Sequence, residues 1–355
     1  MIETKHLELI LAIDELGTLA RAGERLHVTA SALSHQLRRL EDGLRTRLFH
    51  RADNRLHFTE AGEALRDTAR AVLRHHDDLR ERLRELREAD RPRYIHGYSP
   101  GESRRLVDQA ATVADLLHDD SRWPAGAHVL EVGCGVGAQT VLIAALNPEC
   151  RFTCIDVSAA SLAQARAAAE ARGLTNVEFR ERSVFELGRR ERYDHAFVCF
   201  VLEHLDAPGA ALAAVRSALA PGGTVTVVEG DHGSTFFHPA SPWADALVAA
   251  QVELQRRRGG NANIGRELYP LLQGAGYGDI GVRCRQVYVD DARPDLKAGF
   301  IRDTFTAMIR GVVEEAVASK LVTAADARRG IDDLLRTLAP GGTFAYTFLK
   351  AVAQA

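Results

Sequence analysis

The stretch Val129-Leu130-Glu131-Val132-Gly133-Cys134-Gly135-Val136-Gly137 decides the fold of most of this 355-residue chain. A short β-branched run leads directly into three glycines at alternate positions, and the helix-like run Ala138 to Leu146 follows. Strand, glycine loop and helix in this order form the first unit of a doubly wound sheet, whose ligands bind at the carboxyl edge of the strands. The stretch therefore predicts an α/β domain with a ligand site at the glycine loop.

Strand and helix signals alternate downstream of the glycine loop. Phe152 to Asp156 is a second predicted strand that ends in an acid, where a carboxylate can accept hydrogen bonds from both hydroxyls of a ribose. Further strand-like runs lie at 177–179, 196–200, 224–229, 282–289 and 344–349, with helix-like runs at 161–172 and 210–219. The long segment from Pro294 to Leu338 is predicted to form helices that close over the site.

Residues 94–352 resemble class I S-adenosylmethionine-dependent methyltransferases. The glycine stretch matches the family's first motif, and Leu202-Glu203-His204-Leu205 and Leu219-Ala220-Pro221-Gly222-Gly223 match the family as well. A nicotinamide-binding Rossmann domain is the alternative, and it is disfavoured because its GxGxxG pattern has the third glycine one position later than Gly137. The resemblance implies an α/β Rossmann-like methyltransferase sheet with a helical lid, and S-adenosyl-L-methionine as cofactor.

The same resemblance assigns residues to the cofactor. Glu131 and the glycine loop would lie beside the methionine moiety, Asp156 on the ribose and Val157 near the adenine. Ser183 stands where the family often has an aspartate for the adenine amino group, and a hydroxyl is a weaker acceptor there. The segment 94–99, which precedes the fold, is predicted to cap the cofactor. The predicted cofactor-binding residues are Glu131, Gly133, Gly135, Gly137, Asp156, Val157, Ser183 and Tyr98.

Acidic and imidazole side chains follow the predicted fifth strand. Methyl transfer depends mostly on positioning and on exclusion of water, but an acceptor that must lose a proton benefits from a nearby base. The predicted catalytic residues are His232, Asp231 and His204, the last more often a wall residue than a base. The predicted substrate residues are Glu229, His238 and Asn261.

The spacing of Asp231, His232 and His238 also suggests a metal site. A turn that contains glycine and proline does not fix ligand geometry, so no metal is predicted. The polar loop 259–266 either donates amide hydrogen bonds to a ligand or is a solvated connection.

The first ninety residues follow a different pattern. Two short helix-like stretches, 19–26 and 30–40, are joined by a few residues, as in a helix-turn-helix, and two strand-like runs at 48–51 and 56–58 suggest a wing. Residues 21–55 carry eight arginines against four acids, a local charge of +4 in a chain of net charge −3. Short polar side chains can reach base edges, and arginines suit phosphates. The predicted DNA-binding residues are Thr29, Ser31, Ser34, Gln36, Arg38 and Arg51.

Residues 1–88 resemble the winged helix-turn-helix of LysR-type transcriptional regulators. The likeness runs through residues 19–36 and continues in 47–51 and 56–62. Arg45 stands where the family usually has glycine and Gly23 where it has alanine, and both are expected to loosen the scaffold. A three-helix module that only associates subunits is the alternative.

A heptad seam follows the predicted wing. The seam positions, which are apolar except for His76, recur at alternating steps of four and three residues: Leu65, Ala69, Val72, His76, Leu79, Leu83 and Leu86. The LysR-type family dimerises through the equivalent helix. The chain is therefore predicted to form a homodimer through residues 63–88, which gives the two-fold symmetry of a palindromic DNA site.

The composition and the position of Pro92 indicate how the chain is divided into domains. With 46% hydrophobic and 26% charged residues, the chain is neither wholly disordered nor only a coiled coil. A long charged helical pattern stops at Pro92. The plan is multidomain: an all-α winged helix-turn-helix at 1–62, a coiled-coil dimerisation linker helix at 63–92, and the methyltransferase domain at 93–355. No secretory signal, no long uncharged apolar run and five scattered cysteines predict a cytoplasmic protein with no membrane partner.

The leading functional hypothesis is a methyltransferase of a small-molecule acceptor fused to a LysR-like domain that binds double-stranded DNA. The alternative is a transcriptional regulator whose methyltransferase fold senses S-adenosylmethionine or a metabolite. A third possibility is that the winged helix only dimerises an enzyme, which predicts no DNA affinity at moderate salt.

Overall fold

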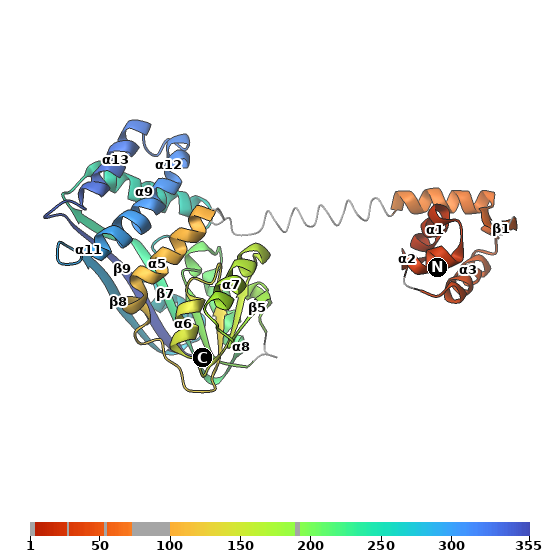
Figure 1. Ribbon diagram of the computed structural model, residues 1–355, viewed down its shortest axis with the longest axis horizontal. Coiled ribbons are helices and arrows are strands. Elements are labelled where there is room, and N and C mark those ends of the chain that lie inside the picture. The colour runs from red at the N-terminus through yellow and green to blue at the C-terminus, as the bar shows by residue number, and fades with distance from the viewer. Residues whose placement is uncertain (1–3, 27, 53–54, 73–99, 189–191) are drawn as a thin grey trace. The chain divides into compact units, whose positions relative to one another are not determined.

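The computed structural model describes residues 4–26, 28–52, 55–72, 100–188 and 192–355 (Figure 1). By internal contacts the chain divides into two compact units, Met1–Arg91 and Pro92–Ala355. In the described part of the chain, no helix is both long and apolar enough to cross a membrane.

The first unit is a winged helix-turn-helix, as predicted. Its elements are helices α1 (Thr4–Leu16), α2 (Leu19–Leu26) and α3 (Ala30–Leu44) and the antiparallel strands β1 (Phe49–Ala52) and β2 (Arg55–Phe58). Leu9, Ile10 and Leu33 are fully buried among these elements because each lies on the apolar face of its helix. Thr29 begins α3 as its N-cap, with its hydroxyl accepting a hydrogen bond from the amide of Ala32 at 3.2 Å.

Glu41 connects α3 to the wing. Its carboxylate is buried, and Oε1 accepts hydrogen bonds from the amides of Leu48 at 2.8 Å and Phe49 at 3.3 Å. Oε2 lies 3.1 Å from Nη1 of Arg47. One acid thus satisfies two backbone donors and a guanidinium where β1 begins, which fixes the wing against α3.

Arg45 ends α3 in the left-handed conformation, with φ 53° and ψ 34°, and its side chain is exposed. This backbone costs an ordinary L-residue about 1–2 kcal/mol and glycine almost nothing. We expect Arg45→Gly to stabilise the first unit by about 1 kcal/mol, which raises its melting midpoint by roughly 4–8 °C. Calorimetry checks this. Arg45→Ala, which removes the side chain and keeps the strain, is the control, and an equal gain in both variants would contradict the explanation.

The described part of the next helix covers residues 60–72. Thr59 caps it, since its hydroxyl accepts a hydrogen bond from the amide of Gly62 at 3.1 Å. Of the predicted heptad seam, Ala69 is buried, whereas Val72 is 46% exposed. The seam positions from His76 onward lie outside the described residues.

The second unit is built on a seven-stranded sheet with the order β5-β4-β3-β6-β7-β9-β8 (Figure 1). The parallel strands are β3 (His128–Val132), β4 (Arg151–Asp156), β5 (Val177–Glu181), β6 (Tyr193–Cys199) and β7 (Leu219–His238). Strand β9 (Thr343–Gln354) pairs antiparallel with both β7 and β8 (Gly278–Val289). The predicted α/β sheet is confirmed. The carboxyl ends of its five parallel strands lie at one edge, where this class of sheet binds ligands.

Helices connect and cover these strands (Figure 1). They are α5 (Pro100–His118), α6 (Thr140–Leu146), α7 (Ala159–Ala171), α8 (Pro208–Ala218), α9 (Pro242–Arg257) and α10 (Leu268–Gly274), with short 3₁₀ turns η1 (Val184–Glu186), η2 (Leu202–His204) and η3 (Ile264–Glu267). The segment between β8 and β9 is helical, as predicted: α11 (Pro294–Leu296), the π-helix η4 (Lys297–Thr306), α12 (Ala307–Ala318) and α13 (Ala324–Arg336).

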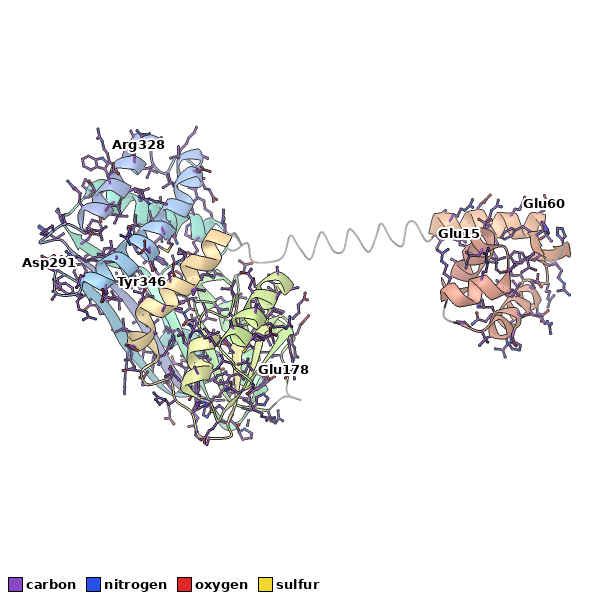
Figure 2. All side chains as sticks on the ribbon, viewed as in Figure 1. Glu15, Glu60, Glu178, Asp291, Arg328 and Tyr346 are labelled. Atoms are coloured by element: carbon purple, nitrogen blue, oxygen red, sulfur yellow. The ribbon has the colours of Figure 1, made fainter. Side chains whose placement is uncertain are left out.

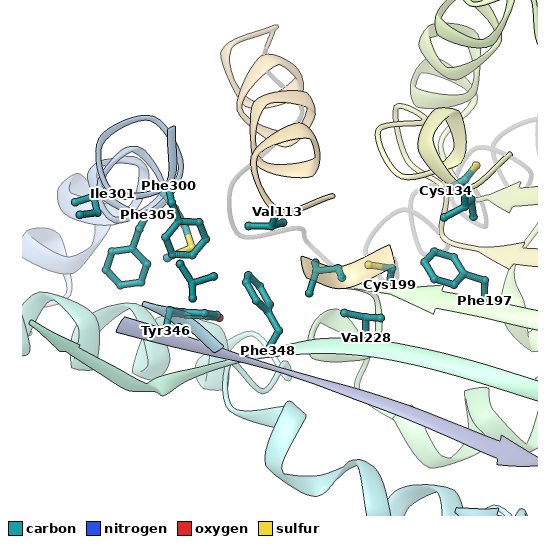
Figure 3. Packing of buried hydrophobic residues seen from close by; sticks show 14 of the residues in the cluster. Val113, Cys134, Phe197, Cys199, Val228, Phe300, Ile301, Phe305, Tyr346 and Phe348 are labelled. Carbon is teal, nitrogen blue, oxygen red and sulfur yellow. The ribbon is translucent and has the colours of Figure 1, made fainter. Parts of the chain in front are cut away.

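Aromatic side chains join the inserted helices to the sheet. Phe300 and Phe305 of η4 lie against Tyr346 of β9, with ring centroids 5.9 Å from it in each case (Figure 3). Phe348 is 4.8 Å from Tyr346 on the same strand. Burial of these rings anchors the insert on the antiparallel end of the sheet, beside the carboxyl end of β7.

One strand was predicted wrongly. The expected strand 224–229 was to be followed by a turn holding Asp231, His232 and His238, but β7 continues unbroken to His238. The reason is β9, which pairs with β7 from Thr224 to Asp231 and again from Phe236 to His238. The register shifts between Asp231 and Phe236, so a bulge begins next to His232.

His118, the last residue of α5, is buried against Phe197, and its Nε2 lies 2.7 Å from Oε1 of Gln139. Burial lowers the pKa of His118 from 6.5 to about 4. As the pH falls from 6.5 towards 4, the unfolded chain takes up a proton that the folded form excludes. We therefore expect the free energy of unfolding of the second unit to fall by about 3 kcal/mol from this group over that range.

Urea unfolding at several pH values, followed by tryptophan fluorescence, checks this because both tryptophans, Trp123 and Trp243, belong to the second unit. The control is His118→Gln, which keeps an amide beside Gln139 and cannot titrate. The same pH dependence in wild type and variant would show that His118 is not responsible.

Candidate active site

The glycine loop between β3 and α6 has three residues with positive φ: Gly133 at 66°, Gly135 at 52° and Gly137 at 79°. A Cβ on Gly133 would lie 2.6 Å from Cγ2 of Val201, and one on Gly137 would lie 3.0 Å from Cα of Ala165. A Cβ on Gly135 would meet no atom within 4 Å. Two glycines are therefore needed for packing, while the third leaves open space that a ligand can occupy.

Asp156 ends β4 directly beside this loop. Its Oδ2 accepts a hydrogen bond from the amide of Gly135 at 2.9 Å, and its Oδ1 accepts one from the amide of Ser158 at 2.8 Å. Burial raises the pKa of Asp156, and these amides partly offset that effect. Val157, the next residue, is half-buried. The carboxyl group thus lies beside the open glycine.

Glu131 is the second acid of the loop region. It is 2% exposed, and its Oε2 has no hydrogen-bond partner among the described residues. Burial raises the pKa of Glu131 to about 7. A buried carboxylate oxygen without a partner is costly and fits a ligand that carries positive charge. The residues present therefore fit S-adenosylmethionine, which has a sulfonium and an ammonium group.

Ser183 lies beyond the carboxyl end of β5, the third strand of the unit. Its hydroxyl accepts a hydrogen bond from the amide of Phe185 at 3.3 Å as the N-cap of η1. The predicted adenine contact at Ser183 thus competes with a local cap. Tyr98 lies outside the described residues.

A second polar group lies just after the carboxyl end of β6 and on the part of β7 that follows Val228, the partner of Cys199. Phe200, the first residue after β6, has φ 57°, a conformation that is uncommon for a non-glycine residue and is often found at functional sites. Glu203 follows in η2, and its Oε2 lies 3.7 Å from Nε2 of His232 on β7. The ring of His232 stands edge-on to Tyr346, with centroids 5.5 Å apart, and Figure 2 places Tyr346 inside the second unit.

Glu229 links this polar group to the glycine loop. It is fully buried, and its Oε1 accepts hydrogen bonds from the amides of Val201 at 2.9 Å and Leu202 at 2.7 Å. Val201 also limits the space at Gly133. The glycine loop, the residues that follow β6 and Glu229 of β7 therefore lie next to one another.

Asp231 is paired with Arg266 of η3, with its Oδ2 accepting from Nε at 3.1 Å and its Oδ1 accepting from Nη2 at 2.5 Å. In the same loop, Asn263 Oδ1 accepts from the amide of Gly233 at 2.8 Å. The side chain of Asn261 donates from Nδ2 to Oε1 of Glu267 at 2.9 Å, and its backbone N–H donates to the carbonyl of Glu203 at 2.8 Å. The polar loop 259–266 is therefore tied to β7 and η2.

His204 and His238, the other two histidines predicted to belong to the site, differ in position. His204 lies beside Glu203, with Nε2 3.6 Å from Oε1. His238 is exposed at the far end of β7, where it pairs with Thr343, while Asp231 pairs with Thr347. Among the described residues, no group of three or more His, Cys, Asp or Glu side chains is placed to bind a metal ion.

Three residues of this site are not among the residues predicted from the sequence: Glu203, Tyr346 and Arg266. Glu203 enters the prediction only as part of a motif, although an acid directly after a predicted parallel strand is a signal for the ligand edge of the sheet. Tyr346 and Arg266 carry no local signal, because β9 and η3 reach the site through the fold.

The candidate DNA interface lies on α3. Ser31, His35 and Arg38 are exposed on one face at helical spacing, opposite the buried Leu33 and Leu37. Of the other predicted residues, Ser34 and Gln36 are half-buried, Thr29 is engaged as the N-cap, and the side chain of Arg51 lies outside the described part. His35 was not in the predicted set.

Two family models match the chain. Residues 4–63 match the model described as "Bacterial regulatory helix-turn-helix protein, lysR family", and residues 130–225 match the model described as "Methyltransferase domain". The HTH-type transcriptional regulator MetR of Escherichia coli K12 is 49% identical over 73 residues, which cover 21% of this chain and 23% of MetR. An uncharacterized protein of Synechococcus is 31% identical over 147 residues, covering 41% of this chain and 34% of that protein. The chain thus spans about a third or less of the length of these relatives.

Solved structures similar to this chain include phosphoethanolamine N-methyltransferase 2 of Haemonchus contortus in complex with phosphomonomethylethanolamine and S-adenosylhomocysteine. It is 16% identical with a TM-score of 0.44, and the match covers 69% of this chain and 52% of that one. The YcgJ protein of Bacillus subtilis is 13% identical with a TM-score of 0.45, and the match covers 69% of this chain and 97% of that one.

Proposed function

Because the chain joins a lysR-family helix-turn-helix domain to a methyltransferase domain, we propose that it transfers a methyl group from S-adenosyl-L-methionine to a small molecule and also binds double-stranded DNA. The observation that carries the catalytic part is the open position at Gly135, whose amide donates to Asp156 at the end of β4. The loop follows Glu131, a buried residue whose Oε2 has no partner among the described residues.

The chain's residues would hold the cofactor along the glycine loop. S-adenosylmethionine supplies a methyl group already activated by positively charged sulfur. Asp156 would accept hydrogen bonds from the ribose hydroxyls, and Glu131 would face the cationic methionine end. Val157 and Ser183 would contact the adenine, and Tyr98 remains a prediction for the cap. The helices between β8 and β9 would exclude water from the reacting atoms.

On the acceptor side, we assign His232 as the proton acceptor and Asn261 as a substrate contact. Asp231 and Glu229 become positioning residues in this proposal, since one is bound to Arg266 and the other to two backbone amides. His204 would form a wall, and His238 would contact only a substrate that extends along β7.

For the rest of the chain we propose the domain limits 1–62, 63–92 and 93–355, with a homodimer formed through 63–88. Exposed Ser31 and Arg38 on α3 support the DNA contact, with Thr29, Ser34, Gln36 and Arg51 completing the proposed interface. Arginines facing phosphate would hold the duplex, and the short polar side chains would reach base edges.

Methyl-labelled S-adenosylmethionine, incubated with the purified chain and a metabolite extract, tests the catalytic part. We expect labelled product and S-adenosylhomocysteine to form in equal amounts. Cofactor binding without turnover in any extract would instead support the alternative, a regulator that senses S-adenosylmethionine or a metabolite.

A further inference from the structure

Glu203 and His232 form a buried carboxylate–imidazole pair. Their side chains are 12% and 7% exposed, and Oε2 of Glu203 is 3.7 Å from Nε2 of His232. Gln255 of α9 holds the carboxylate by donating to Oε2 at 3.0 Å, and it also donates to the Glu203 carbonyl at 2.9 Å. The Glu203 carboxylate is therefore held in place by the fold.

The other ring nitrogen of His232 is Nδ1. Nδ1 is buried and has no hydrogen-bond partner in the described part of the chain. A buried polar atom left without a partner costs about 1–3 kcal/mol, so such an atom in a native site calls for an explanation. The bulge of β7 begins at this residue, which is a common way for a strand to re-aim a side chain near an active site.

The pKa values of the neighbouring Glu203 and Glu229 are shifted in opposite directions. Burial raises the pKa of Glu203, but His204, His232 and Gln255 outweigh burial and hold it below the usual range. Burial, and then the charge of Glu203, raise the pKa of Glu229 well above the usual range. Glu203 is thus the charged member, which can stabilise a protonated imidazole, and Glu229 is the neutral one.

Asp231, a charged neighbour of His232, already has an ion-pair partner. Asp231 is bound to Arg266, and the nearby phenol of Tyr346 has its pKa raised by burial and by the three acids Glu203, Asp231 and Glu229. Among the described residues, Nδ1 of His232 therefore remains unpaired and can take up a proton from an acceptor.

We infer that Glu203 positions His232 as the proton acceptor, and that the methyl acceptor reacts through a heteroatom that carries a hydrogen: a hydroxyl, a thiol or an N–H group. This rests on the proposed methyl transfer. The acceptor's heteroatom forms a bond to the methyl carbon while the methyl–sulfur bond breaks and its electron pair goes to sulfur. The heteroatom's proton passes to Nδ1, and the imidazolium formed is stabilised by Glu203 until water removes the proton.

A first test needs no acceptor. Nitrogen-15 NMR of histidine-labelled full-length protein in alkaline buffer reports which ring nitrogen carries the proton, with His232→Gln used to assign the signals. We expect the proton of His232 on Nε2, towards Glu203, in the wild type. In Glu203→Gln it should distribute over both nitrogens because an amide can donate as well as accept. A wild-type proton on Nδ1 would overturn the inference.

A second test uses the labelled-extract assay with Glu203→Gln, and with Glu253→Gln on the outer side of α9 as the matched charge-removal control. We expect kcat to fall about 100-fold in Glu203→Gln, with the Kd for S-adenosylhomocysteine unchanged, and we expect no effect of Glu253→Gln. The methylated product should be an ether, a thioether or an N-methyl compound formed from an N–H group. A wild-type kcat in Glu203→Gln, or a sulfonium or quaternary ammonium product, would overturn the inference. If the cofactor binds but no labelled product forms, the proposed function is contradicted. The NMR measurement of the His232 tautomer would then still test the present inference independently.

Discussion

Gly135→Ala should weaken the binding of S-adenosylhomocysteine by about 100-fold or more, with the second unit still folded. The added Cβ meets no protein atom within 4 Å, so the folded chain accommodates it at the cost of a left-handed alanine alone. The space it fills is the space in which the proposed cofactor lies against the backbone. A methyl group there would force the ligand away from its hydrogen bonds, and loss of about 3 kcal/mol corresponds to that factor.

Gly173→Ala is the matched control for this variant. Gly173 has φ 66°, and a Cβ added to it would also meet no atom within 4 Å, but it lies in the turn after α7 and away from the loop. Both variants therefore carry similar backbone strain, of about 1–2 kcal/mol. Titration calorimetry with S-adenosylhomocysteine and tryptophan-monitored melting separate the two effects. Equal affinities for the two variants would show that Gly135 does not face the cofactor.

The glycine loop and its acids were predictable because their signal is local. Three glycines at alternate positions after a β-branched run specify a tight turn, and the acid at Asp156 follows a second strand within one βαβ unit. The structure adds what spacing does not contain: Gly133 and Gly137 are required by Val201 and Ala165, whereas Gly135 is open.

The acceptor side was less predictable because it is assembled by long-range pairing. His232 is a candidate from the sequence, but the prediction places it in a turn, since the partner that keeps β7 extended is more than one hundred residues away on β9. Its neighbour Glu203 comes from the end of β6, and Tyr346 comes from β9. Short windows of sequence hold the strand propensity of each segment but not its partner.

Arg45, which stands where the LysR-type pattern usually has glycine, is a feature that the sequence shows and the structure explains. A difference from the LysR-type pattern is visible in the sequence, and the structure explains it by a left-handed residue that ends α3. The expected loosening is therefore a backbone cost at one position. The exposed face of α3 at Ser31, His35 and Arg38 is unaffected by it, so DNA binding is expected to persist despite that cost.

Replacing Arg38 and Arg39 by alanine should reduce DNA affinity by about 100-fold per chain, from the loss of about 3 kcal/mol in two charge-assisted phosphate contacts. Both arginines are exposed on α3, and within the described residues neither has a carboxylate partner, unlike Arg70, which is bound to Asp14. The plot of log affinity against log salt should become less steep by about 1.8 per chain, because about 0.9 is lost with each phosphate contact.

Fluorescence anisotropy with a labelled duplex, measured from low to moderate salt, gives both quantities. Arg70→Ala removes one positive charge, from a guanidinium that is bound to Asp14, so the DNA affinity and salt dependence of this variant should match the wild type. Loss of affinity with an unchanged salt slope in the double variant would mean that α3 does not contact phosphate. Absence of DNA binding by the wild type at any salt would instead favour the third possibility, in which the winged helix only associates subunits.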